Sequence, residues 1–190
     1  SIDEEHLKNV SYFKKNPIIP NISVYDSLIM LSKFYRNECA VDCLDLQVSY
    51  NKLIDNSVII SKALKELGIK KGDIVTVSMP NFYQAIAVFF AANRIGAVTT
   101  FLNSSSNVEE VKYYLNLFES SLFINFDKTR EYNETIKNST KVKNVVTLNK
   151  MDINKKDFNI NKKMGYDDLI SFNDLESVSK YYTKFINPYQ

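Results

Sequence analysis

Residues 63–98, ALKELGIKKGDIVTVSMPNFYQAIAVFFAANRIGAV, carry the pattern that decides the fold. Gly68 follows an apolar helical stripe, and a glycine there is typical of a helix end in the left-handed conformation. The run at 74–79 is apolar and β-branched, as in a strand buried on both faces. The run at 82–95 is apolar around most of its circumference, which is typical of a buried helix, and a glycine separates it from a second strand at 97–102. The pattern therefore predicts a strand–helix–strand unit.

Two helices are predicted before this unit. The first covers 24–37, with Ser23 as its N-cap and Asp26 completing a capping box. Its core face is expected to hold Val24, Leu28, Leu31 and Tyr35. The second begins after Ser49, and a short extended run at 40–46 precedes it. Its buried stripe is expected to hold Leu53, Ser57, Ile60, Leu64 and Leu67.

Strands and helices keep alternating after the unit. Ser106 as N-cap and Glu109 three residues later predict a capped helix. Its core face is expected to hold Val108, Val111, Leu115 and Phe118. The remaining predicted elements are a strand at 122–126, a polar helix at 129–138, a strand at 142–148, an exposed loop at 149–165 and a short helix at 166–170.

This alternation predicts an α/β fold with a mostly parallel, Rossmann-like sheet and helices on both faces. Residues 1–22 contain Pro17, Pro20 and several Asn residues, which predict an irregular N-terminal arm. Residues 23–190 are predicted to form a single α/β domain, as a fragment of a larger N-terminal domain.

The composition is that of an ordinary folded domain. Hydrophobic residues make up 45% and charged residues 24% of the 190 residues, which argues against disorder. With 24 basic and 22 acidic side chains, the formal net charge of +2 gives no electrostatic reason to expect a nucleic-acid partner. The longest apolar stretch, 82–102, contains Arg94 and Gly96, so no membrane span is expected. No secretory signal is visible, and a cytoplasmic location is expected.

Few residues could perform chemistry. The two cysteines, Cys39 and Cys43, and the single histidine, His6, are too few to predict a disulfide scaffold or a zinc site. Only 4 glycines occur, and no Gly-rich loop could place successive backbone N–H groups on a phosphate. The residues by themselves therefore predict no catalytic residue and no metal ligand.

Several segments resemble motifs of adenylate-forming enzymes. They are SYNKL at 49–53, ALKELGIKKGDIVTVSMPN at 63–81, FFAANRIGAV at 89–98, FLN at 101–103 and VEEVKYYLNLFESSLFI at 108–124. In this order and spacing, over roughly residues 20–150, they are similar to the N-terminal part of AMP-forming acyl-CoA synthetases, and of long-chain fatty-acid–CoA ligases in particular.

The resemblance implies a two-step ligase. In this family a carboxylate reacts with ATP, assisted by Mg²⁺, to form an acyl-adenylate, and coenzyme A then takes the acyl group. The family's Ser/Thr/Gly-rich phosphate loop ending in Lys, its later nucleotide motifs and its catalytic Lys have no match in this sequence. The chain is therefore expected to be an N-terminal fragment that is inactive alone and holds no cofactor itself, while the parent enzyme uses ATP, Mg²⁺ and coenzyme A.

The resemblance also implies a candidate coenzyme A entrance. In acetyl-CoA synthetases this entrance combines the loop after the second strand with a basic residue after the next strand. The corresponding residues here are Asn103, Ser104, Ser105 and Ser106, together with Arg130. The loop has serines where the family has glycines, although hydroxyls can bind a pantetheine amide and an arginine can bind a phosphate. The competing interpretation, a helix-capping serine run and a solvated arginine, is favoured.

Two other functions stay open. One is a non-catalytic binding or assembly module of the same fold, and the other is part of an amino-acid-activating adenylation module. Asn103 favours the acyl-CoA synthetases, because amino-acid-activating modules usually carry Asp there. The expected partners of the parent are a small-molecule carboxylate and coenzyme A. The fragment is also expected to expose apolar side chains near Phe82, Phe89 and Phe90, or to bury them by self-association.

Overall fold

A five-stranded sheet with the strand order β4-β3-β5-β6-β7 forms the middle layer of the molecule. The computed structural model describes residues 23–44, 46–150, 153 and 169–171. The strands of this sheet are β3 (Ile74–Ser78), β4 (Val98–Leu102), β5 (Leu122–Phe126), β6 (Asn144–Leu148) and β7 (Leu169–Ser171). All neighbouring strands pair in parallel, as the sequence pattern predicts.

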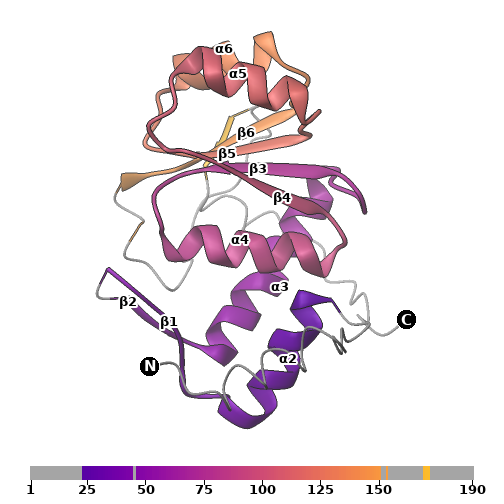
Figure 1. Ribbon diagram of the computed structural model, residues 1–190, viewed down its shortest axis with the longest axis vertical. Helices are drawn as coiled ribbons and strands as arrows, with labels where there is room; N and C mark the ends of the chain where they lie inside the picture. The colour runs from indigo at the N-terminus through magenta and orange to yellow at the C-terminus, as the bar shows by residue number, and fades with distance from the viewer. Residues whose placement is uncertain (1–22, 45, 151–152, 154–168, 172–190) are drawn as a thin grey trace, which may run out of the picture.

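Helices cover both faces of the sheet (Figure 1). They are α2 (Val24–Tyr35), α3 (Tyr50–Glu66), α4 (Tyr83–Arg94), α5 (Val108–Leu117) and α6 (Arg130–Ser139). Helices α3 and α4 lie on one face with α2 beside them, and α5 and α6 lie on the other (Figure 1). The extended run predicted at 40–46 is an antiparallel pair, β1 (Cys39–Cys43) and β2 (Leu46–Ser49), outside the main sheet. The predicted α/β fold with helices on both faces is confirmed.

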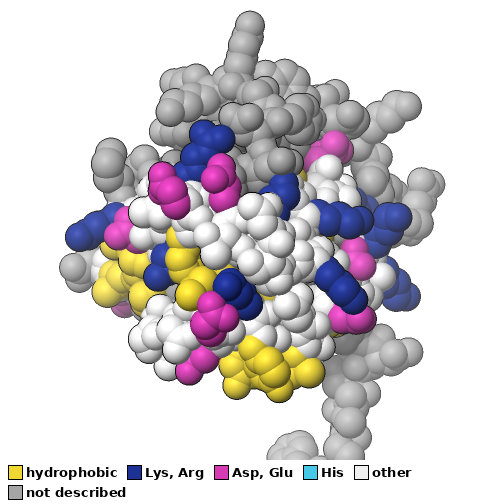
Figure 2. All heavy atoms as spheres, turned by 90° about the horizontal axis from the view of Figure 1, so that it is seen from above, with side chains coloured by type: hydrophobic (Ala, Val, Ile, Leu, Met, Phe, Trp, Pro, Cys, Tyr) yellow, Lys and Arg dark blue, Asp and Glu magenta, His cyan; other side chains and the backbone are white. Residues whose placement is uncertain are grey.

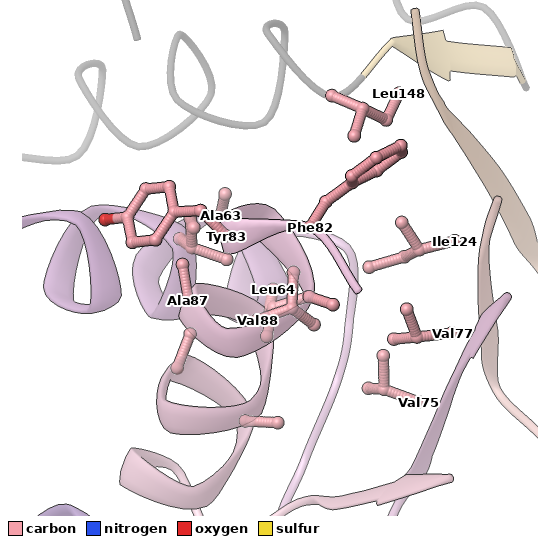
Figure 3. Packing of buried hydrophobic residues seen from close by; sticks show 14 of the residues in the cluster. Ala63, Leu64, Val75, Val77, Phe82, Tyr83, Ala87, Val88, Ile124 and Leu148 are labelled. Atoms are coloured by element: carbon pink, nitrogen blue, oxygen red, sulfur yellow. The ribbon is translucent and has the colours of Figure 1, made fainter. Parts of the chain in front are cut away.

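Each face of the sheet has its own apolar core. Figure 3 shows Val75 and Val77 of the sheet facing Leu64 of α3 and Val88 of α4. The core on the opposite face consists of Val111, Leu115, Phe123, Ile136, Val142 and Val145. Strands β3, β5 and β6 are thus covered on both sides, which explains why their sequences are continuous apolar runs rather than alternating ones.

The predicted starts of α2 and α3 and the predicted end of α3 are confirmed. The Ser23 hydroxyl accepts a hydrogen bond from the Asp26 N–H at 3.1 Å, and the Asp26 carboxylate accepts one from the Ser23 N–H in return. The Ser49 hydroxyl accepts from the Lys52 N–H at 3.2 Å. Gly68 has a φ of 84°, the left-handed conformation expected after a helix.

The predicted N-cap of α5 is wrong by one residue. Asn107, not Ser106, caps the helix, because its side-chain oxygen accepts from the Glu110 N–H at 3.0 Å. Both candidate pairs have the spacing of a capping box, and Asn caps helices as well as Ser does. Helix α5 therefore begins at Val108, and Val111 and Leu115 are its buried residues.

Helix α2 buries a narrower stripe than its sequence predicts. Tyr25 and Leu28 are buried, at 7% and 5% exposure. Val24, Leu31 and Tyr35, which were predicted to face the core, are 48%, 45% and 45% exposed. The helix lies outside α3 and α4 and meets them along one side only, so the apolar face has too little surface to pack against.

The short helix predicted at 166–170 is wrong where the structure describes it. Leu169–Ser171 form β7, in which Leu169 lies opposite Val145 of β6. A strand forms here because β6 offers a free edge, and such a partner is invisible to a local sequence pattern. The predicted arm at 1–22 and most of the loop predicted at 149–165 lie outside the described residues.

Gly68→Ala is expected to lower the free energy of unfolding by about 1–2 kcal/mol, because a Cβ is disfavoured in the left-handed conformation. A Cβ built at Gly68 meets no atom within 4 Å, so the loss would report backbone strain alone. Gly68→Asn, which tolerates this conformation better, should recover part of the loss. Urea denaturation followed by circular dichroism measures both variants, and equal stability of Gly68→Ala and the parent chain would contradict the left-handed helix end.

Candidate pocket at the carboxyl ends of the strands

The strand order creates a topological switch point between β3 and β5. Helix α4 leads from β3 to β4 on one side, and α5 leads back across β3 to β5 on the other. In open parallel sheets, ligands bind beyond the carboxyl ends of the strands at such a point. Ser78 and Phe126 end the two strands that flank it. The fold therefore favours a site at this end of the sheet.

An aromatic pair fills the switch point itself. The ring of Phe82 meets that of Phe126 edge-on, with the ring centroids 4.9 Å apart, and Figure 3 shows Phe82 beside Leu148. Phe82 is only 7% exposed, so the expectation of an exposed side chain is wrong for this residue. Phe89 and Phe90 are half-buried. The two rings therefore leave no room for a ligand at the switch point, and the pocket lies beside it, toward β4.

A pocket of about 690 Å³ lies between α4 and the carboxyl ends of β3 and β4. Its walls are Met79, Pro80, Asn81, Phe82, Ala85, Ile86, Phe89, Phe101, Leu102, Asn103 and Ser104. Apolar side chains make up most of this lining, and Asn81, Asn103 and Ser104 add polar groups, a composition typical of small-molecule sites. None of these lining residues is charged, so the pocket suits a neutral apolar group better than a phosphate.

The loop after β4 is held largely by its own hydrogen bonds. The side-chain oxygen of Asn103 accepts from the Ser105 N–H at 3.0 Å and from the Ser105 hydroxyl at 2.8 Å. The Asn103 carbonyl accepts from the Ser106 N–H at 3.0 Å and from the Ser78 hydroxyl at 3.3 Å. Asn103 and Ser105 thus fix the shape of the loop, while Ser104 lies exposed at the edge of the pocket.

Arg130 lies apart from the pocket lining, on the first turn of α6. Its Nε donates to Glu134 Oε1 at 3.1 Å, and its side chain is 70% exposed. The structure therefore brings Asn103 and Ser104 to the pocket, but not Arg130. Burial raises the pKa of Tyr132, on the same helix, above its ordinary value of 10.0. This shift extends to higher pH the range over which the Tyr132 phenol stays protonated.

A buried polar ring beneath α6 was missed by the sequence analysis. Asn125 Nδ2 donates to Asn133 Oδ1 at 2.8 Å, and Asn133 Nδ2 donates to Thr147 Oγ1 at 2.7 Å. The Thr147 hydroxyl donates to Asn125 Oδ1 at 2.7 Å and closes the ring. The ring fixes α6, and with it Arg130, on β5 and β6. No local signal distinguishes these two asparagines from the many exposed ones in the sequence.

Metal-binding groups do not gather in the part of the chain that the structure describes. No three His, Cys, Asp or Glu side chains come close enough there to hold a metal ion. Cys39 and Cys43 are free thiols, and their Sγ atoms donate to the carbonyls of Val41 at 3.3 Å and Asn81 at 2.8 Å. None of the described helices is both long and apolar enough to span a bilayer.

The strand order, the crossover helices and the pocket at the carboxyl ends define a doubly wound α/β protein. Within that class, the sequence profile of the AMP-binding enzyme family matches residues 32–176, and the chain belongs to this family. The resemblance to adenylate-forming enzymes drawn from the sequence motifs is thereby confirmed.

The relatives include ligases of several kinds. The chain is 32% identical to the acetyl-coenzyme A synthetase of Coprinopsis cinerea over 90 residues, which are 47% of this chain and 14% of that enzyme. It is 29% identical to the 2,3-dihydroxybenzoate-AMP ligase of Bacillus subtilis over 90 residues, which are 47% of this chain and 17% of that ligase. The coronafacic acid ligase of Pectobacterium brasiliense shares the fold, with a TM-score of 0.66 at 22% identity, over 82% of this chain and 29% of that one. The matched part is thus a minor share of each relative.

Proposed function

We propose that this chain contributes the N-terminal α/β unit of an ATP-dependent, AMP-forming acyl-CoA synthetase. Membership of the AMP-binding enzyme family over residues 32–176 carries the proposal. In the proposed reaction a carboxylate attacks ATP, forming an acyl-adenylate and releasing pyrophosphate, and the thiol of coenzyme A then displaces AMP to give a thioester. A long-chain fatty acid as the carboxylate and a cytoplasmic location belong to the same proposal.

The described residues do not fit ATP with Mg²⁺. The pocket lining has no cationic side chain to neutralise a triphosphate, and no described group of three acidic, His or Cys side chains could hold a metal ion. The adenylation step is therefore not assigned to the residues that the structure describes. By this proposal, the 190 residues alone form no acyl-adenylate.

Coenzyme A fits the described residues better. The apolar wall of the pocket suits the alkyl parts of a pantetheine arm, and the exposed Ser104 hydroxyl lies at its edge to bind an amide. Arg130 is exposed and offers a guanidinium to a phosphate of the same ligand. We propose Asn103, Ser104, Ser105 and Ser106 with Arg130 as the entrance for coenzyme A. Because Asn103 and Ser105 are already bonded to each other, Ser104 is proposed as the main contact of the loop.

Arg130→Ala is expected to weaken the binding of coenzyme A by up to about fivefold, since one exposed ion pair contributes about 0.2–1 kcal/mol. Lys141→Ala is the matched control, because Lys141 lies beyond the far end of α6 and pairs with Glu119 in the open, at 3.4 Å. Calorimetric titration measures the affinity of the unsubstituted chain and of the two variants for coenzyme A and for dephospho-coenzyme A, which lacks the ribose phosphate. If Arg130 binds the ribose phosphate, Arg130→Ala should lose affinity for coenzyme A but not for dephospho-coenzyme A.

Other outcomes discriminate between the proposed functions. Equal affinity of all three chains would contradict the role of Arg130. No binding of coenzyme A by any of them would favour a ligase with another acceptor or a non-catalytic module. Specific binding of Mg-ATP by the unsubstituted 190-residue chain would contradict the assignment of the nucleotide site to another part of the enzyme.

A further inference from the structure

Ser78 carries a buried hydroxyl at the carboxyl end of β3, one residue before Met79 of the pocket lining. It is 9% exposed. In the sheet it lies opposite Leu102 of β4 on one side and Asn125 of β5 on the other. Parallel ladders on both sides hold its backbone, so Ser78 belongs to the rigid centre of the sheet and can serve as a fixed support for a neighbouring loop.

The loop at 103–106 depends on hydrogen bonds for its position. Asn103, Ser104 and Ser105 are exposed, so burial contributes little to holding them in place. The Asn103 side chain bonds to Ser105, and the Asn103 carbonyl accepts from the Ser106 N–H. Both interactions lie within the loop, so they set its shape but do not attach it to β3.

The Ser78 hydroxyl supplies this attachment. Its Oγ donates to the Asn103 carbonyl at 3.3 Å. Among the residues that the structure describes, Ser78 is the one residue outside the loop with a hydrogen bond to residues 103–106. The distance is long for a bond between a hydroxyl and a carbonyl, but water competes little for a hydroxyl that is 9% exposed.

We propose that Ser78 is a positioning residue of the coenzyme A entrance and acts through Ser104. The inference rests on the proposed binding of coenzyme A. By tying the Asn103 carbonyl to the centre of the sheet, Ser78 holds the next residue, Ser104, at the edge of the pocket, where its hydroxyl binds a pantetheine amide. Figure 2 shows Lys and Arg side chains interspersed with Asp and Glu on the face over α5 and α6, rather than gathered in one basic patch. Charge alone therefore attracts coenzyme A weakly, and the placement of individual polar groups matters more.

Ser78→Ala is expected to speed the amide hydrogen exchange of Ser105 and Ser106, and to weaken coenzyme A binding, each by about two- to tenfold, the effect of one lost hydrogen bond. Ser78→Thr keeps the hydroxyl and should restore both properties. Ser57→Ala is the matched control, because the buried Ser57 hydroxyl donates to the Leu53 carbonyl at 2.6 Å within α3, away from the loop. NMR measures the exchange in the free 190-residue chains, and calorimetric titration measures the affinity for coenzyme A.

A double-mutant cycle tests whether Ser78 acts through Ser104. Calorimetric titration compares Ser78→Ala, Ser104→Ala and the double variant with the unsubstituted chain. If Ser78 serves only to place the Ser104 hydroxyl, Ser78→Ala should cost no further affinity in a chain that already carries Ser104→Ala. Losses that add fully in the double variant would overturn the action through Ser104.

The two readouts separate failure of this inference from failure of the proposed function. Unchanged amide exchange in Ser78→Ala, or an equal change in Ser57→Ala, would overturn the attachment of the loop whether or not coenzyme A binds. Faster exchange in Ser78→Ala with unchanged affinity would overturn its role in binding. If the unsubstituted chain binds no coenzyme A although Ser78→Ala speeds the exchange, the proposed coenzyme A site is wrong, and the role of Ser78 in binding is wrong with it, while the attachment of the loop stands.

Discussion

Phe123→Ala is expected to lower the free energy of unfolding by about 3–5 kcal/mol, the range for removing a fully buried aromatic ring. Phe123 is the second residue of β5 and is 0% exposed. Its ring belongs to the core between the sheet and α5 and α6, together with Leu115 of α5 and Ile136 of α6. Because this core is small, few neighbouring side chains can move into the space that the ring leaves.

Urea denaturation of Phe123→Ala measures this loss. Phe34→Ala is the control, because Phe34 on α2 is 80% exposed and its removal should change stability by less than about 0.5 kcal/mol. If Phe123→Ala lowered the free energy of unfolding as little as Phe34→Ala, α5 and α6 would not cover this face of the sheet. The difference between the two variants therefore tests the layer arrangement as well as the single residue.

Asn133→Ala should have the second largest effect, a loss of about 2–3 kcal/mol, since a buried polar group left unsatisfied costs about 1–3 kcal/mol. The substitution removes the acceptor of Asn125 Nδ2, which is 2.8 Å from Asn133 Oδ1, and one donor to Thr147. The residue is 5% exposed, so water does not readily replace either group. Asn138→Ala, on the exposed side of the same helix, should instead be neutral or slightly stabilising, because Ala favours helices more than Asn does.

A chain with all three ring members made apolar distinguishes a polar ring from simple packing. Asn125→Val, Asn133→Leu and Thr147→Val together leave no unsatisfied partner, so their combined loss should be smaller than that of Asn133→Ala alone. If the loss of stability in the triple variant equalled the sum of the losses in the three single variants, the three side chains would not bond to one another.

Where the sequence pattern succeeded, the interacting residues are neighbours in the chain. The caps at Ser23 and Ser49 depend on a residue three positions later, and the left-handed conformation of Gly68 depends on its missing Cβ. The strand predicted at 122–126 has those bounds in the structure, because a run of apolar residues there reflects burial on both faces. The pattern failed where two local solutions are equally good, as with the caps Ser106 and Asn107 of α5.

The candidate site shows the same division. Asn103 and Ser104 were named from the sequence and do line the pocket, but Arg130 lies elsewhere, and the pocket walls around α4 were not predicted. The aromatic pair of Phe82 and Phe126 could not be predicted either. Helix α4, strand β4 and helix α5 lie between these two residues in the chain, and only the crossover of α5 brings them together.

The sequence by itself determined the α/β class, the parallel sheet with helices on both faces and the relationship to AMP-binding enzymes, because these depend on periodicity, caps and motifs that are local in the chain. Only the tertiary structure decided the strand order, the filled switch point, the displaced pocket and the polar ring under α6. Each of these depends on which distant segments pair. Distant segments pair in the arrangement that buries both faces of the sheet at once, and the sequence of a single segment does not specify that arrangement.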